Sequence, residues 1–117
     1  LSLSQGMQPV ASIQVEIDNK LYEGSANGGG QYEAFMKALW KIYDSIGKEK
    51  PVLTDYRVAI PPGGKTDALV ETIITWHFKN HSFTTKGLDV DQTVAAIKAT
   101  EKMLNIIELK KQISEPA

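Results

Sequence analysis

The hydrophobic and polar positions of this chain follow two periods, and the change from one to the other predicts its elements. Apolar residues at every second position, Ile13, Val15 and Ile17, predict a half-buried strand over residues 12–18. Turn-forming residues follow, and residues 21–26 predict a second strand that closes a hairpin. Apolar residues spaced by three and four positions then predict an amphipathic helix that ends at Gly47.

A second set of elements follows after residue 50. Residues 52–60 predict a strand, because they are rich in β-branched and aromatic residues, and Pro61–Gly64 must break it. Residues 68–78 are apolar at both parities, which predicts a central strand, and residues 82–86 pair back with it. A helix is predicted from about Gln92 to Lys110 with Asp91 as its N-cap. Its predicted core stripe is Val94, Ile97, Leu104 and Ile107, beside small residues suited to close packing, Ala95, Ala96 and Ala99.

The order of these elements contains a repeat. Strand, turn, strand, glycine and helix occur over residues 12–46 and again over 68–109, with the strand 52–60 as an extra element. The repeat predicts an α+β fold, a pseudo-symmetric two-unit sandwich of antiparallel hairpins plus helices in the order ββα, β, ββα. Residues 1–10 are predicted as a linker remnant of a longer protein, 11–113 as one domain and 114–117 as a flexible tail.

Composition narrows the classes of function. A length of 117 residues suits one domain, and a net charge of −1 provides no basic surface for nucleic acid. The chain has no Cys, which excludes a disulfide scaffold and thiolate chemistry and fits a cytoplasmic protein, and no apolar run is long enough to span a membrane. Its two histidines, His77 and His81, are four residues apart but not on a predicted helix, so they predict no metal pair.

Other groups that could carry catalysis lack a matching arrangement. Ser25 has no GxSxG elbow around it and no histidine close in sequence. The carboxylates are dispersed, which is typical of helix caps and solvated charges: Glu33, Asp55, Asp67, Asp89 and Asp91. The sequence therefore predicts no catalytic activity for this fragment, and a small stand-alone enzyme is a remote alternative.

Three consecutive glycines, Gly28, Gly29 and Gly30, lie between the second predicted strand and the first predicted helix. Glycine lets a backbone approach a ligand closely, and a helix start directs N–H groups outward that can bind a carboxylate or phosphate. Taken alone, a glycine run is more typical of a tight turn. No Lys-Ser or Lys-Thr follows these glycines, which argues against a phosphate loop.

Longer segments resemble a known family. The segment IQVEIDNKLYEGSANGGGQYEAFMKAL resembles the C-terminal regulatory domain of the 2-isopropylmalate synthase and citramalate synthase family, in which a hairpin precedes roughly GxGPxDAxxxAL. The segment GLDVDQTVAAIKATEKMLN is similar to that family's DxxxASxxAxxxxLN helix. The strands LTDYRVAIPPGG and ALVETIITW fall in the expected order, so the resemblance covers about residues 10–109.

The resemblance implies a regulatory domain rather than an enzyme. In that family this domain forms a homodimer and binds the end-product amino acid of the pathway as a feedback inhibitor. Acetyl-CoA and a divalent metal belong to a separate catalytic domain of the same chain, so no cofactor is expected here. With the repeat and the helix start, the resemblance favours a ligand site at the glycines over a plain turn.

The family's effector site carries over onto Gly28, Gly29, Gly30, Gln31 and Tyr32. The effector's carboxylate would meet the backbone N–H groups, and its ammonium would meet a loop carbonyl or Glu33. We expect an apolar wall for its side chain from Leu53, Tyr56, Ile60 and Val70. Leu53 has the opposite parity to Tyr56 and Ile60, so this wall requires a β-bulge or an irregular strand start.

Departures from the family pattern bear on the effector. Gln31 replaces the usual Pro, Tyr32 replaces a smaller aliphatic residue and Glu33 replaces Asp, while Thr93 and Val94 differ in the second helix. These departures favour isoleucine, and hence a citramalate synthase, with a leucine-binding domain of 2-isopropylmalate synthase as the alternative. A double-stranded RNA-binding module is a remote alternative, since Asp89 and Asp91 at the helix start would repel phosphates.

Overall fold

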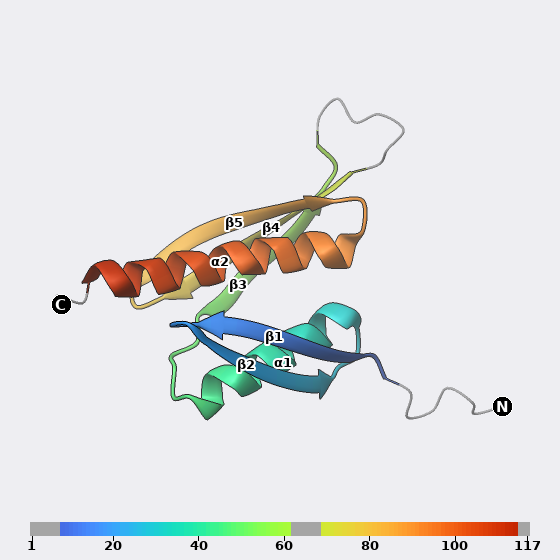
Figure 1. Cartoon of the computed structure of the whole chain (residues 1–117). Coiled ribbons are helices and arrows are strands. Elements are labelled where there is room, and N and C mark those ends of the chain that lie inside the picture. Colours follow the sequence, from blue (N-terminus) through green and yellow to red (C-terminus); the bar gives the residue numbers. More distant parts are fainter. Residues whose placement is uncertain (1–7, 62–68, 115–117) are drawn as a thin grey trace. The chain divides into compact units, whose positions relative to one another are not determined.

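The computed structural model describes residues 8–61 and 69–114, with side chains as far as Leu109. The chain divides into a first unit of residues 1–50 and a second unit of residues 51–117 (Figure 1). Most of the predicted linker remnant, the predicted break at Pro62–Gly64, Asp67 and residues 115–117 lie outside the described residues.

The first unit is one hairpin packed on one helix: β1 (Val10–Ile17), β2 (Lys20–Asn27) and α1 (Gln31–Ser45). The strands pair antiparallel, with Ile17 opposite Lys20. Asp18 and Asn19 between them both have positive φ, 54° and 66°, as a two-residue type I′ turn requires. Exposed and less exposed residues alternate along β1 as predicted, and its odd-numbered residues lie on the side of the sheet against which α1 packs. Helix α1 ends at Ser45 with Ile46 as its C-cap, and Gly47 follows with φ 70°, in agreement with the predicted end at Gly47.

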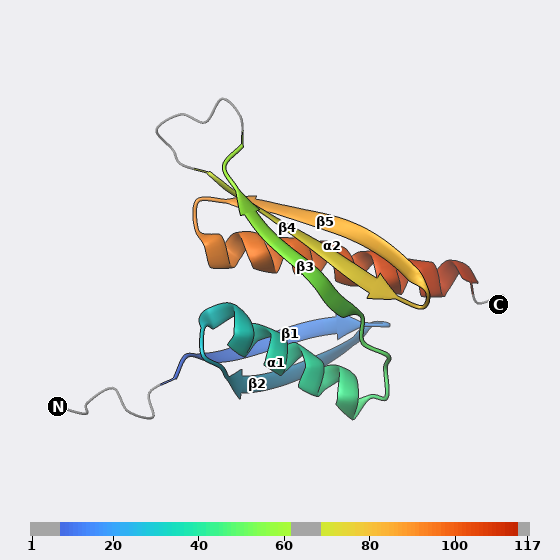
Figure 2. The ribbon, with the colours of Figure 1, turned by 180° about the vertical axis from the view of Figure 1, so that it is seen from behind.

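The second unit is a three-stranded sheet with one helix: β3 (Val52–Ala59), β4 (Val70–Phe78), β5 (His81–Asp89) and α2 (Gln92–Ser114). The sheet is antiparallel in the order β3-β4-β5, which confirms β4 as the central strand. Lys79 and Asn80 form a second two-residue turn with positive φ, 49° and 66°. Helix α2 lies along β4 and β5, as Figures 1 and 2 show from opposite sides.

The α+β class and the two hairpin-plus-helix units are therefore confirmed. The repeat also has a constant separation of 61 positions, which relates the turn residue Asn19 to Asn80 and the helix start at Gly30 to Asp91. The same separation relates the buried Ala34 to Ala95. Strand β3 has no counterpart among the described residues of the first unit, in agreement with its prediction as an extra element.

Contacts between α2 and its sheet differ from the predicted core stripe. Gly87 lies so close to the helix that a Cβ there would overlap the backbone carbonyl oxygen of Ala95. At that separation only methyl groups fit, so Ala95 and Ala99 are fully buried whereas Val94 is 38% exposed. Of the predicted stripe only Ile107 is buried, and Ile97 and Leu104 are half-buried. The predicted close packing of the alanines is confirmed.

Some element ends also differ from prediction. β1 begins at Val10, β5 continues to Asp89 and α2 continues to Ser114, so each is longer than its apolar pattern. Backbone hydrogen bonds extend a strand or helix past its last apolar residue, and sequence periodicity does not record them.

Candidate functional site

Gly28 allows the loop before α1 to lie directly on the first turn of that helix. Its N–H donates to the carbonyl oxygen of Pro9 at 3.1 Å, which extends the hairpin ladder by one pair. A Cβ at Gly28 would lie 2.5 Å from the backbone nitrogen of Ala34. Only glycine fits at this distance, so Gly28 is required by packing whether or not a ligand binds.

Gly30 is different, because nothing around it requires glycine. It is the N-cap of α1, with φ −141° and ψ 174°, an extended conformation open to any residue. A Cβ added at Gly30 would have no heavy atom of the described residues within 4 Å. Glycine at an N-cap provides no side-chain acceptor for the first-turn N–H groups, which have no acceptor within the helix itself.

A carboxylate already lies at this loop, and it belongs to Glu33. The Gly29 N–H donates to Glu33 Oε1 at 2.7 Å, and Lys37 Nζ lies 3.4 Å from Glu33 Oε2. The hydrogen bond from Gly29, and then the interaction with Lys37, hold the pKa of Glu33 below its ordinary value. The loop thus stabilises negative charge, as expected at the positive end of a helix. The role of Glu33 as acceptor for an effector's ammonium stays a prediction.

The helix start of the second unit provides an internal comparison. Asp91 Oδ1 accepts from the N–H groups of Thr93 at 2.8 Å and of Val94 at 3.1 Å, so Asp91 is the N-cap, as predicted. Before it, Asp89 Oδ1 accepts from the Asp91 N–H at 2.9 Å, and Asp89 Oδ2 pairs with Lys98 Nζ at 2.9 Å. The hydrogen bond from Asp91, and then that from Lys98, lower the pKa of Asp89. Side-chain carboxylates of the chain itself therefore occupy this helix start.

Gln31 and Tyr32 begin α1 beside the glycines. Gln31 is exposed, while Tyr32 is half-buried with its ring stacked on that of Phe35, the centroids 6.1 Å apart. A stacked ring has a fixed position, so Tyr32 presents a defined aromatic surface next to the loop. The structure thus brings together all six predicted residues from Gly28 to Glu33.

The four predicted apolar residues belong to the second unit, where one irregularity places Leu53 and Tyr56 on one face. Leu53 is opposite Trp76 and Tyr56 is opposite Ile74, and the register shifts between Leu53 and Asp55. Because Trp76 and Ile74 are two residues apart in β4, their partners share a sheet face despite opposite parity. The β-bulge or irregular strand start that the predicted wall requires is therefore present as this register shift.

This face remains apolar and open along β3. Leu53 and Tyr56 are 37% and 36% exposed, and α2 lies over β4 and β5 beside them. Ile60, which directly follows β3, is 74% exposed, and Val70 is half-buried on the Ile74 side of β4. Val58 is a further exposed residue of this face that our prediction missed, although it has the same parity as Tyr56. That these residues contact an effector stays a prediction.

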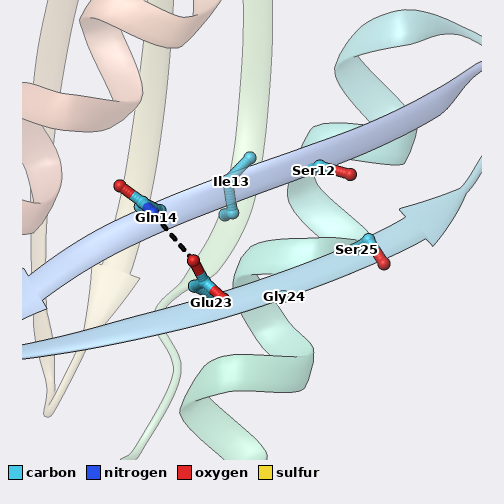
Figure 3. Close-up of a pocket in the computed structure, with 6 residues that line it drawn as sticks. All are labelled: Ser12, Ile13, Gln14, Glu23, Gly24 and Ser25. Carbon is cyan, nitrogen blue, oxygen red and sulfur yellow. Dashed lines mark hydrogen bonds between the residues drawn. The ribbon is translucent and has the colours of Figure 1, made fainter.

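A separate hollow lies on the first unit, on the face of the β1–β2 hairpin. Figure 3 shows its lining, with the side chains of Ser12 and Ser25 on one side and Gln14 bonded to Glu23 on the other. The Gln14 Nε2 donates to Glu23 Oε2 at 2.7 Å. The remaining lining residues are Ile13 and Gly24. None of the residues predicted to bind an effector lines this hollow.

The described residues contain no group of three or more His, Cys, Asp or Glu side chains that could hold a metal ion. His77 lies in β4, and its Nδ1 is 3.1 Å from Ser82 Oγ, an ordinary contact between neighbouring strands. Within residues 8–61 and 69–114, no helix is long and apolar enough to cross a membrane.

Comparison with known proteins agrees with the resemblance noted in the sequence. A family model described as the LeuA allosteric (dimerisation) domain matches residues 1–108. The chain is 35% identical over 104 residues to the 2-isopropylmalate synthase of Methanocaldococcus jannaschii, covering 89% of this chain and 19% of that protein. The 2-isopropylmalate synthase of Aquifex aeolicus is 31% identical over 107 residues, 91% of this chain and 19% of that protein.

A relative with another name is similar to a comparable degree. The putative (R)-citramalate synthase of Methanosarcina mazei is 31% identical over 97 residues, which cover 83% of this chain and 20% of that protein. The chain thus spans about a fifth of the length of the curated relatives it matches.

Proposed function

The chain belongs to the LeuA allosteric (dimerisation) domain family, and from this membership we propose that it is the feedback-regulatory domain of a longer synthase. In this proposal it binds the branched-chain amino acid that ends the pathway, and binding inhibits a separate catalytic domain of the same chain. The parent protein would be an acetyl-CoA-dependent synthase with a divalent metal in that other domain. We further propose that it is cytoplasmic and acts as a homodimer.

One observation supports Gly28–Glu33 as the site of the effector's carboxylate: the two equivalent helix starts differ in whether a side chain closes them. Asp91 caps the second helix with its own carboxylate, whereas Gly30 has no side chain to offer the first. A free amino acid carries the carboxylate that Gly30 lacks, and the positive end of α1 would stabilise it.

The Glu33 side chain would change its position when such a ligand binds, so its negative charge would not repel the ligand's carboxylate. The Glu33 carboxylate accepts the Gly29 N–H and faces Lys37 across the surface of α1. An incoming carboxylate would take the N–H groups at the start of the helix, and Glu33 would turn to accept the effector's ammonium. The exchange conserves charge at the loop, because the zwitterionic ligand brings one positive and one negative group.

The identity of the effector depends on the apolar residues. We propose isoleucine first, which makes the parent a citramalate synthase, because the bulky Tyr32 beside the loop changes which branched side chain fits. Leucine and a 2-isopropylmalate synthase are the second candidate. We assign contact with the effector's side chain to Leu53, Tyr56, Ile60 and Val70, whose shared face is apolar and partly uncovered. One methyl position is worth only about 1–3 kcal/mol, so we expect preference rather than complete exclusion.

Thermal melting with isoleucine, leucine, valine or a short RNA duplex tests the proposal. A ligand that binds the folded state raises the melting temperature by mass action, and we expect one branched-chain amino acid to give the largest rise. Gly29→Val should remove that rise and keep the fold, because a Cβ there meets only the mobile end of Glu33, at 2.8 Å. No shift with any of the three amino acids would contradict the proposed function.

A further inference from the structure

Lysines occupy equivalent positions on the two helices of the repeat, Lys37 on α1 and Lys98 on α2. Lys98 Nζ lies 2.9 Å from the carboxylate of Asp89, and Lys37 Nζ lies 3.4 Å from that of Glu33. Each carboxylate also accepts a backbone N–H group from the loop before its helix. In both units, therefore, a loop N–H group and a lysine of the helix hold one carboxylate between them.

The two carboxylates reach these positions from opposite sides of the helix start. Asp89 ends β5, before the helix, and its side chain is only 24% exposed. Glu33 lies in the first turn of α1, its side chain is 54% exposed, and its counterpart in α2 is the uncharged Val94. An exposed ion pair contributes little to stability. Glu33 can therefore turn away and release Lys37, whereas Asp89 is a permanent partner of its lysine.

The first unit cannot supply a carboxylate in the way that Asp89 does. Asp89 pairs with Val70 at the end of its hairpin. Its counterpart Gly28 donates its N–H to Pro9, the counterpart of Val70, so the two loops leave their hairpins at the same place. A side chain at Gly28 is excluded, because its Cβ would lie 2.5 Å from the backbone nitrogen of Ala34. A carboxylate that approaches Lys37 from the loop side must therefore come from a ligand.

We propose that Lys37 binds the carboxylate of the effector, in the way that Lys98 binds that of Asp89. The inference rests on the proposed function, and it adds a side-chain cation to the backbone N–H groups assigned to the effector's carboxylate. In this arrangement the effector's carboxylate replaces that of Glu33 beside Lys37 and the Gly29 N–H. Glu33 turns to the effector's ammonium, so every charged group keeps a partner of opposite charge.

Lys37 would also determine the class of ligand that can bind. A carboxylate is needed to replace Glu33 as the partner of Lys37, and a neutral carboxamide carries no charge to do so. We therefore expect the loop to select a free amino acid over its amide, and over the same residue within a peptide chain. Selection of this kind suits a sensor that responds to a free metabolite in the presence of proteins and peptides.

Isothermal titration calorimetry with isoleucine and leucine, and with the carboxamide of each, tests this role of Lys37. Lys37→Met removes the charge of an exposed side chain and keeps its alkyl chain, so the fold should be retained. We expect the variant to bind the amino acid about tenfold more weakly, as for the loss of one charged hydrogen bond, and the carboxamide no more weakly. A lysine that only positioned Glu33 would change the binding of both ligands alike and leave their ratio unchanged.

Lys98→Met is the matched control, because it makes the same change at the equivalent position of the second unit. It removes the lysine partner of Asp89, so it should lower the melting temperature and leave the preference for the amino acid over its carboxamide unchanged. An unchanged preference in Lys37→Met would overturn the role of Lys37 and leave the proposed function intact. Failure of the unmodified chain to bind either amino acid would overturn both.

Discussion

Gly30 and Asp91 are equivalent N-caps of two repeated units, and only Asp91 provides a side-chain acceptor for its own helix. Both helices begin in the same place relative to their hairpins, but one start is closed by a carboxylate and the other is not. On the proposed function, this difference separates a helix start that the chain caps itself from one that would bind a ligand.

Gly30→Asp should close the first helix start in the way Asp91 closes the second. The extended φ and ψ of Gly30 and the space around its Cβ position accept the new side chain without strain. We expect unfolding free energy to rise by a few tenths to about 1 kcal/mol. We also expect the amino-acid-dependent rise in melting temperature to disappear, since the aspartate would occupy the carboxylate position.

Gly30→Ala is the matched control, because it adds a Cβ without a carboxylate. Alanine is a poorer N-cap than glycine, which lowers stability, but it also reduces the entropy of the unfolded chain, which raises stability. The two effects oppose each other, so we expect the unfolding free energy to change by no more than about 0.5 kcal/mol. The melting shift should remain. If Gly30→Asp still responds to the amino acid as the unmodified chain does, the carboxylate does not bind at this helix start.

Gly28→Ala should destabilise the protein, in contrast to Gly30→Ala. Its Cβ would meet the backbone nitrogen of Ala34 at 2.5 Å, and a helix backbone cannot move aside as a flexible side chain can. We expect a loss of about 1–3 kcal/mol, measured by urea denaturation. Equal stability of the two variants would show that the loop does not lie on α1 as described.

The sequence predicts those parts of the fold that local patterns determine, and it fails where contacts between elements decide the packing. The hairpins and both helices follow from apolar period and turn residues, and Asp91 follows from N-cap chemistry. The core of α2 does not, because Gly87 permits an approach that replaces Val94 by Ala95 at the interface. A rule that counts large apolar residues misses such packing.

The candidate site is likewise predicted only in part: the sequence locates the loop, and the structure gives its geometry. The glycines identify the loop, but the sequence does not distinguish Gly28, which packing requires, from Gly30, which packing does not. Strand parity alone places Leu53 and Tyr56 on opposite faces of β3. They share a face only because the register shifts between Leu53 and Asp55. The hydrogen bond between Gly29 and Glu33 depends on loop geometry that no motif specifies.

Acid should weaken the protein through Glu33 and Asp89. The pKa of each carboxyl group is held below its ordinary value, 4.5 for Glu33 and 3.8 for Asp89, by backbone hydrogen bonds and then by a lysine. A lowered pKa means that the folded state favours the charged form, so the stabilisation is complete above the ordinary value and is lost as pH falls through the lowered one.

We therefore expect the unfolding free energy to decline below about pH 4.5 in urea melts. Glu33→Gln should decline less steeply, because it lacks one of the two groups, and Asp89→Asn should behave likewise at lower pH. Carbon NMR titration of the side-chain carboxyls gives each pKa directly. A midpoint for Glu33 at or above its ordinary value would contradict the hydrogen bond from Gly29.

Two threonines under α2 should respond in opposite ways to the same substitution. Thr85 Oγ1 accepts from the buried Trp76 Nε1 at 2.9 Å, so Thr85→Val leaves an indole N–H without a partner and should cost about 1–3 kcal/mol. Thr72 is fully buried in β4, and its Oγ1 has no hydrogen-bond partner among the residues that the structure describes. Thr72→Val keeps the shape of the side chain and removes the unpaired hydroxyl, so we expect the unfolding free energy to stay the same or to rise by up to about 1 kcal/mol.

Urea denaturation of both variants measures the difference in unfolding free energy. A Thr72→Val protein as unstable as Thr85→Val would show that the Thr72 hydroxyl is hydrogen-bonded in solution.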